Sequence, residues 1–138
     1  FRTHPVAYLV SQIFEEHDRD CFEIFAFSFC SHLEEDRYQK RIINSVDKFI
    51  FCENLSDLEI VNLSKELNID IAIDLTGHTA GNRINLFIKK VAPIQINYLG
   101  NPGTVGKHMD YIIADKNLIP YENKKFYFEK GTLKDSRQ

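Results

Sequence analysis

Polar side chains that could act on a substrate gather in three short segments of the sequence. These are Phe1–Pro5 (FRTHP), Asp74–Arg83 (DLTGHTAGNR) and Leu99–Gly106 (LGNPGTVG). The first precedes a helical pattern, and the other two follow apolar runs typical of strands. Parallel α/β sheets bind their ligands outside the carboxyl ends of the strands. We therefore predict that His4, His78 and the Pro102–Thr104 bend converge at one rim of such a sheet.

The second segment holds the densest group of residue types that carry chemistry. Asp74 ends an apolar run, where a carboxylate is costly to bury unless it is paired. His78, Thr79 and Arg83 follow, so that an acid, an imidazole, a hydroxyl and a cation share one glycine-flanked turn. This combination could bind a polar substrate and move a proton. The alternative is a tight turn in which Asp74 caps its own backbone.

The first and third segments carry weaker signals. His4 precedes Pro5 at the start of a helical pattern, where the helix dipole disfavours a charged imidazole and so favours a base. A capping or merely exposed histidine is the alternative. Gly103 and Thr104 lie in a glycine-rich stretch that can present N–H groups to an anion. That stretch lacks the Walker and G-x-G-x-x-G patterns, so an ordinary turn remains the alternative.

Hydrophobic periodicity predicts the elements that position these segments. A helix is expected from Val6 to Phe14, with Pro5 in its first turn. Ser56 and Glu59 form a capping box at the start of another helix, which Asn68 ends. Further helices are expected at 34–46 and 83–90, and strands at 22–29, 48–52, 69–75, 93–99 and 111–114. The strands at 22–29 and 69–75 are apolar enough to be buried.

This alternation of helices and strands predicts a Rossmann-like, doubly wound α/β fold with a mainly parallel sheet. We expect one lobe over residues 1–115 and a polar C-terminal extension over 116–138, a loop with one short helix. Such folds open with a central strand, and the chain starts after the position of that strand. A truncated chain, or a strand supplied from elsewhere, is expected. An exposed sheet edge of this kind makes a homo-oligomer possible.

Composition narrows the classes of function. The 138 residues are 43% hydrophobic and 27% charged, with a net charge of −3, so nucleic acid is not an expected partner. Residues 1–60 hold six Lys/Arg and twelve Asp/Glu, whereas residues 61–138 hold eleven and eight. An anionic small molecule would prefer the second half. The three cysteines lack metal-ligand spacing and indicate reduced thiols of a cytoplasmic protein, and no membrane span or metal site is expected.

Several segments together resemble the O-GlcNAc transferase and SPINDLY-like family, glycosyltransferase family 41. The matching segments are FRTHPVAYLV, HDRDCFEIFAFS, NIDIAIDLTGHTAGNR, VAPIQINYLGNPGTVG and MDYIIAD, in the order of the family and over nearly the whole chain. The resemblance implies the N-terminal lobe of a GT-B architecture. It also implies tetratricopeptide (TPR) repeats upstream and a second catalytic lobe, with the phosphate-binding Lys, downstream.

The resemblance further implies an activity: inverting, metal-independent transfer of a sugar to Ser or Thr hydroxyls of an acceptor protein, with no cofactor. The donor would be UDP-N-acetylglucosamine (UDP-GlcNAc), or GDP-fucose in the SPINDLY branch. We expect the 138-residue fragment to be inactive by itself. Two other interpretations remain open, a non-catalytic binding or scaffold module from a truncated gene and a flavodoxin-like ligand-binding domain.

The family motifs also suggest roles for individual residues. His4 matches the HP histidine proposed as a base or active-site contact, and His78 with Thr79 matches a loop lining the acceptor and sugar. The turn of Pro102, Gly103 and Thr104 matches one near the sugar. Two positions depart from the pattern: Tyr98 stands where many members have Trp, and Asn101 where an aromatic or histidine is common. Our order of preference for a direct role in proton transfer is His4, then His78, then Asp74 as an orienting partner.

Overall fold

The computed structural model describes residues 1–100 and 103–133 of the chain. They form two compact units, Phe1–Leu55 and Ser56–Gln138. Each unit contains its own parallel sheet, of two strands in the first and four in the second. The predicted α/β class with parallel strands and flanking helices is confirmed. The predicted boundary at residue 115 stays a prediction.

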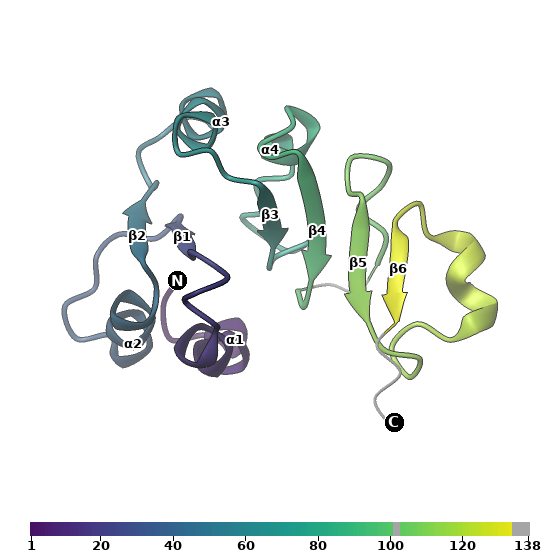
Figure 1. The fold of residues 1–138 in the computed structure, drawn as a ribbon, viewed down its shortest axis with the longest axis horizontal. Coiled ribbons are helices and arrows are strands. Elements are labelled where there is room, and N and C mark those ends of the chain that lie inside the picture. The colour runs from purple at the N-terminus through teal and green to yellow at the C-terminus, as the bar shows by residue number, and fades with distance from the viewer. Residues whose placement is uncertain (101–102, 134–138) are drawn as a thin grey trace. The chain divides into compact units, whose positions relative to one another are not determined.

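The first unit pairs two helices with a short sheet (Figure 1). Its elements are α1 (Pro5–Glu16), β1 (Phe25–Ser28), α2 (Arg37–Ser45) and β2 (Lys48–Phe51). The strands run parallel, with Phe25 opposite Lys48. The helices bury Val10 of α1 and Ile42 of α2, which are 1% and 0% exposed. Apolar residues at helical spacing thus form the core of this unit.

The second unit contains a four-stranded parallel sheet in the order β3-β4-β5-β6 (Figure 1). Its elements are α3 (Asp57–Glu66), β3 (Ile71–Asp74), α4 (Asn85–Ile88), β4 (Ile94–Tyr98), β5 (Tyr111–Ala114), the 3-10 helix η1 (Tyr121–Phe126) and β6 (Lys130–Leu133). The capping box predicted at the start of α3 is present, because Ser56 and Glu59 each accept a backbone N–H of the other.

A buried glutamine side chain bonds to the segments on either side of β4. Gln95 of β4 is completely buried, and its amide donates to the carbonyls of Phe87 and His108, at 3.0 and 2.6 Å. Its side-chain oxygen accepts the N–H of Val91 at 2.9 Å. Every side-chain polar atom therefore has a partner, as a buried amide requires. This ties β4 to the connections on either side of it.

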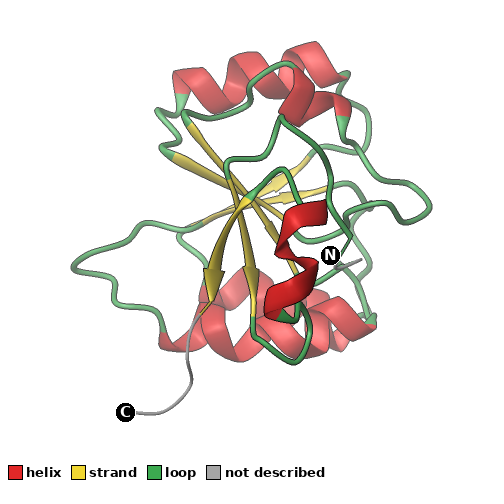
Figure 2. Cartoon of the chain, turned by 90° about the vertical axis from the view of Figure 1, so that its right-hand side faces the viewer, coloured by secondary structure: helices red, strands yellow, loops and turns green. Residues whose placement is uncertain are grey.

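Two expectations about the strands were wrong. The tail after Asp115 contains η1, as the expected short helix, but also β6, which pairs in parallel with β5. The run at 69–75 is not fully buried, because Ile71 and Ile73 of β3 are 44% and 50% exposed. Successive residues of a strand face opposite sides, and the face that carries Asp74 is the buried one. Loops, green in Figure 2, connect these short elements.

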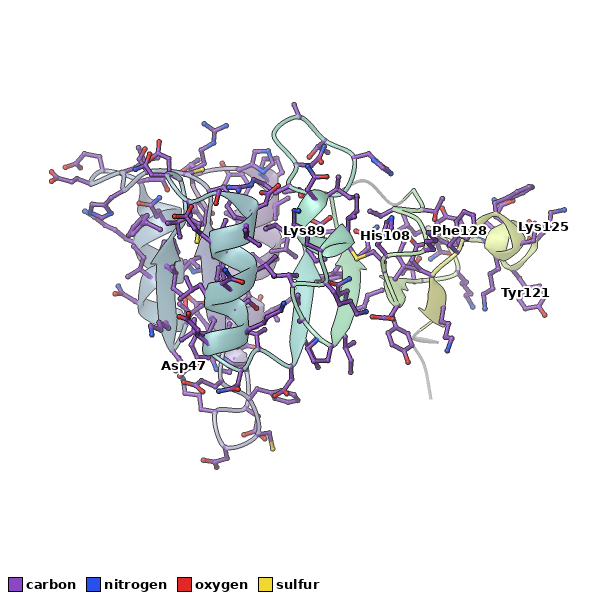
Figure 3. The ribbon with its side chains drawn as sticks, turned by 90° about the horizontal axis from the view of Figure 1, so that it is seen from above. Asp47, Lys89, His108, Tyr121, Lys125 and Phe128 are labelled. Atoms are coloured by element: carbon purple, nitrogen blue, oxygen red, sulfur yellow. The ribbon has the colours of Figure 1, made fainter. Side chains whose placement is uncertain are left out.

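The aromatic residues around η1 remain exposed. Tyr121 and Phe128 are 81% and 74% exposed, and they lie with Lys125 at the η1 end of the second unit (Figure 3). Lys124 lies over the Tyr121 ring, with its Nζ 5.1 Å from the ring centroid. Between these aromatics and β6 comes Glu129, which is only 5% exposed.

Candidate active-site loops

The carboxylate of Asp74 organises the second polar segment. It closes β3 and is only 6% exposed. Its Oδ1 accepts the N–H and the hydroxyl of Thr76, at 2.9 and 2.6 Å, and its Oδ2 accepts the N–H of Gly77 at 3.1 Å. Gly77 has a φ of 55°, which glycine adopts without steric cost. Asp74 therefore caps its own turn, the alternative that the sequence left open.

The ring of His78 is oriented by the third segment. Its Nε2 lies 3.1 Å from the carbonyl oxygen of Thr104, while the side chain is exposed. A carbonyl oxygen only accepts hydrogen bonds, so Nε2 carries the hydrogen and donates it. In the neutral ring Nδ1 then holds the lone pair. The structure thus presents a histidine whose other ring nitrogen, Nδ1, can accept a proton.

The third segment is held by a carboxylate far along the chain. Glu129 Oε2 accepts the Thr104 hydroxyl at 2.6 Å. Its Oε1 accepts the N–H groups of Val105 and Gly106, at 2.5 and 3.1 Å. These two N–H groups are already engaged, so they are not available to an anion. For this part of the segment the contacts favour the ordinary turn, which the sequence left open, over the presentation of N–H groups to an anion.

The second and third segments approach each other backbone to backbone. Gly100 has a φ of 34°, and a Cβ at that position would lie 2.6 Å from the carbonyl carbon and oxygen of Thr76. The amide of Asn97, at the end of β4, donates to the Gly103 carbonyl at 3.3 Å. The structure therefore brings His78 and Thr104 together in the second unit. Pro102 and Asn101 lie outside the described residues, so the sugar-side role of the bend stays a prediction.

The remaining predicted site residues of this unit have separate surroundings. Arg83 donates from Nε and a terminal nitrogen to Asp57 at the start of α3, at 2.8 and 2.5 Å. Thr79 donates its hydroxyl to the Thr76 carbonyl at 2.9 Å. Tyr98 alternates with the buried Asn97 and lies on the opposite face of β4 from it. Their roles in substrate binding stay predictions.

His4 belongs to the first unit, and its ring accepts a hydrogen bond from the backbone, whereas that of His78 donates one. It is the N-cap of α1, and its Nδ1 accepts the N–H of Val6 at 3.3 Å. That bond occupies the Nδ1 lone pair, so the hydrogen of the neutral ring sits on Nε2. The outer nitrogen of His4 is therefore a donor. Because His4 and His78 lie in different units, their predicted convergence stays a prediction.

Asp36 anchors the segment before His4. Its carboxylate accepts the N–H and hydroxyl of Thr3, at 2.6 and 3.0 Å, and caps α2 through the N–H of Gln39 at 2.9 Å. Burial raises the pKa of this carboxyl, but the N–H groups of Thr3 and Gln39 and the Thr3 hydroxyl outweigh it, so the pKa lies below its ordinary value. The charged form of Asp36 thus holds the start of α1.

The described residues offer no group of three or more His, Cys, Asp or Glu arranged to hold a metal ion. No helix in the described part of the chain is long and apolar enough to cross a membrane. Cys21 is exposed, Cys30 is partly exposed and Cys52 is buried.

Three positioning carboxylates were missed from the sequence: Asp36, Asp57 and Glu129. Asp36 and Asp57 lie at helix starts, where an acid is common enough to draw no attention. Glu129 gave a clearer signal. It is a single acid following the aromatic run FYF, and a charge among apolar residues is expected to have buried partners.

Comparison with known proteins agrees with the predicted family. Residues 1–135 match glycosyl transferase family 41. A probable UDP-N-acetylglucosamine–peptide N-acetylglucosaminyltransferase SEC from Arabidopsis thaliana is 30% identical over 131 residues, 94% of this chain and 13% of that protein. A UDP-N-acetylglucosamine–peptide N-acetylglucosaminyltransferase from Caenorhabditis elegans is 30% identical over 135 residues, 94% of this chain and 11% of that protein.

A solved structure shows the same arrangement of the chain. A mutant O-GlcNAc transferase from Thermobaculum terrenum matches with a TM-score of 0.90 and 30% identity, over 96% of this chain and 25% of that one. The parallel strands and flanking helices therefore match part of an O-GlcNAc transferase. This chain spans only 11–14% of the length of such curated relatives. On the match over residues 1–135, the chain belongs to glycosyl transferase family 41.

Proposed function

We propose that this chain forms part of a protein O-glycosyltransferase that transfers N-acetylglucosamine from UDP-GlcNAc to Ser or Thr hydroxyls with inversion. The observation that carries the proposal is the hydrogen bond from Nε2 of His78 to the Thr104 carbonyl. Because Nε2 carries the hydrogen, Nδ1 of the neutral ring has a lone pair. A hydroxyl nucleophile needs such a proton acceptor. The names of the relatives supply the donor and the acceptor class.

The chemical step follows from these groups. The acceptor hydroxyl oxygen attacks the anomeric carbon in line with the leaving group, and the bond from that carbon to the diphosphate oxygen breaks. The hydroxyl proton passes to Nδ1 of His78, and UDP leaves with the electron pair of the broken bond. Proton transfer of this kind contributes about 10²–10⁴-fold to a rate. The Asp74 turn and Thr104 hold the imidazole in place.

His4 has a different role in this proposal. Because its Nδ1 accepts the Val6 N–H, the free nitrogen of the neutral ring, Nε2, carries a hydrogen and can only donate. We infer that it binds an oxygen of the donor or acceptor substrate. This reverses our sequence-based preference for His4 over His78 as the base. We propose that Asp74 acts only through the turn that precedes His78, because its carboxylate accepts hydrogen bonds from Thr76 and Gly77.

The choice of UDP-GlcNAc over GDP-fucose rests on the relatives. SEC and the Caenorhabditis elegans protein are 30% identical to this chain, whereas SPINDLY proteins from Eustoma exaltatum and Arabidopsis thaliana are 26% and 27% identical. All of these relatives, the SPINDLY proteins included, are named as N-acetylglucosaminyltransferases, so the O-fucosyltransferase implied by the family resemblance is the second candidate. We further infer a cytoplasmic location, upstream TPR repeats and a second lobe that grips the nucleotide.

The test compares the full-length gene product with residues 1–138. Each is incubated with a Ser/Thr-containing acceptor peptide and either UDP-GlcNAc or GDP-fucose, and sugar transfer is followed by mass spectrometry. We expect transfer of N-acetylglucosamine by the full-length protein only. Fucose transfer would support the second candidate. A full-length protein that transfers neither sugar would contradict both and favour a binding or scaffold module.

A further inference from the structure

The strongest unassigned feature of the second unit is the carboxylate of Glu129. It is 5% exposed and directly precedes β6, more than twenty residues after the segment it holds. A buried charge is costly unless hydrogen bonds compensate it. Glu129 accepts three such bonds, and all three come from Thr104–Gly106. Among the described residues, the hydrogen bonding of this carboxylate is therefore directed at one loop.

We propose that Glu129 is a positioning residue that fixes the Thr104 carbonyl and, through it, the ring of His78. Its two oxygens grip the Thr104 hydroxyl and the next two backbone N–H groups. The peptide that carries the Thr104 carbonyl oxygen includes the Val105 N–H, so gripping that N–H sets the direction of the carbonyl. The carbonyl accepts Nε2–H of His78 at 3.1 Å. Glu129 thus helps to keep the lone pair of His78 on Nδ1.

Further hydrogen bonds to the Thr104 hydroxyl hold the same loop. The Thr104 hydroxyl oxygen also accepts the N–H of Gly106 at 3.2 Å and that of Phe128 at 3.4 Å. The residue before Glu129 therefore contacts Thr104 as well. The third segment is closed against the start of β6, and any movement there is passed to the acceptor of the His78 hydrogen bond.

The first test requires no enzymatic activity. In isotope-labelled residues 1–138, NMR of the ring carbons and nitrogens gives the fraction of His78 in each neutral tautomer. We expect nearly pure Nε2–H tautomer in the unchanged chain, and a mixture with the Nδ1–H tautomer after Glu129→Ala. Glu129→Gln keeps one acceptor oxygen, so its effect is expected in the same direction but smaller. Glu122→Ala, an exposed acid of η1, is the matched control and leaves His78 unchanged.

If Glu129→Ala does not fold, Glu129→Gln decides the question. Unchanged His78 signals in the folded variants, relative to Glu122→Ala, would overturn the proposal. The amide signals of β3–β5 show whether each variant is folded. A general loss of structure is therefore not mistaken for a local change at His78.

The kinetic test rests on the proposed function. In the full-length protein we expect Glu129→Gln to lower kcat by up to about 10²-fold, since small displacements of a catalytic group have effects of that size. The KM for the donor should change by less than about 2-fold, because Glu129 does not touch it. A change in KM alone would overturn the positioning role. A changed tautomer without any transferase activity in the unsubstituted protein would support the positioning role and contradict the proposed function.

Discussion

His4 and His78 show how two local backbones give the same side chain opposite capacities. His4 caps α1 through Nδ1, so its outer nitrogen is a donor. His78 donates through Nε2 to Thr104, so its outer nitrogen is an acceptor. Both neutral rings carry hydrogen on Nε2, yet only His78 can take a proton from a substrate without losing a bond to the protein. What decides whether the remaining ring nitrogen donates or accepts is the protein group that binds the first one, rather than the motif around the histidine.

The two segments are also held in different ways. The segment before α1 depends on Asp36, a partly exposed carboxylate that bonds to Thr3. The His78 loop depends on the buried Asp74 turn and on close backbone contact with Gly100. We therefore expect the His78 loop to be the more rigid of the two, which suits a group that must be aligned with a reacting atom.

The largest expected effect comes from replacing each histidine by the amide residue that keeps its hydrogen bond to the backbone. His78→Gln keeps a donor for the Thr104 carbonyl but has no basic nitrogen, so kcat of the full-length protein should fall by about 10²–10⁴-fold. His4→Asn keeps an acceptor for Val6 and should mainly raise KM, by about 10-fold, for one lost hydrogen bond to substrate. Steady-state kinetics on both variants check this, and equal losses of kcat would break the comparison.

The backbone contact between the two loops is the next target. Gly100→Ala would place a Cβ against the carbonyl of Thr76, whereas Gly81 has positive φ but nothing within 4 Å of the position that a Cβ would occupy. Both substitutions carry backbone strain of about 1–2 kcal/mol. The steric overlap should add about 1–3 kcal/mol for Gly100→Ala alone. Urea unfolding of the two variants measures the difference, and equal losses of stability would show that the loops are not in contact.

A smaller effect is expected from the cap of α1. His4→Ala removes the acceptor for the Val6 N–H and should cost about 1 kcal/mol of stability, while His4→Asn, a strong N-cap residue, should cost little. Thermal unfolding of the two variants gives the comparison. If His4→Ala is as stable as His4→Asn, then Nδ1 does not cap the helix and its lone pair is available.

The smallest expected effect is the pH dependence contributed by Asp36. Its folded-state pKa is lowered, so its stabilising contribution is present above the unfolded-state value of about 3.9 and is lost as pH falls through the folded-state value. Asp36→Asn should flatten the decline in stability below about pH 4. Urea midpoints as a function of pH test this, with Glu34→Gln as an exposed control; an unchanged profile would show that Asp36 does not anchor the segment.

Much of the fold was predictable from local patterns. The helical spacing after Pro5 and the capping box at Ser56 predicted α1 and α3, because each depends only on neighbours in sequence. The strand β6 was missed because Lys130–Leu133 pairs with a strand some twenty residues earlier and has no pattern of its own. Its existence depends on the sheet edge that β5 offers.

The candidate site was predictable only in part. The residue types in the Asp74 and His78 turn indicated a polar site. The sequence also offered a turn cap as the alternative for Asp74 and a helix cap as the alternative for His4, and the structure shows both contacts. The order that we propose for the two histidines was not predictable, because it depends on the backbone carbonyl of Thr104, which carries no side-chain signal. The acid after the aromatic run FYF indicated that Glu129 has buried partners, but not which ones, because two of them are backbone N–H groups.

The most direct test of this account is the hydrogen position on the two imidazoles, measured by NMR of the ring nitrogens in labelled protein at a pH where both rings are neutral. We predict hydrogen on Nε2 in both, with a scalar coupling across the bond from the Val6 N–H to Nδ1 of His4 and no such coupling to Nδ1 of His78. Hydrogen on Nδ1 of His78, or a backbone N–H coupled to it, would contradict the claim that this nitrogen is the proton acceptor.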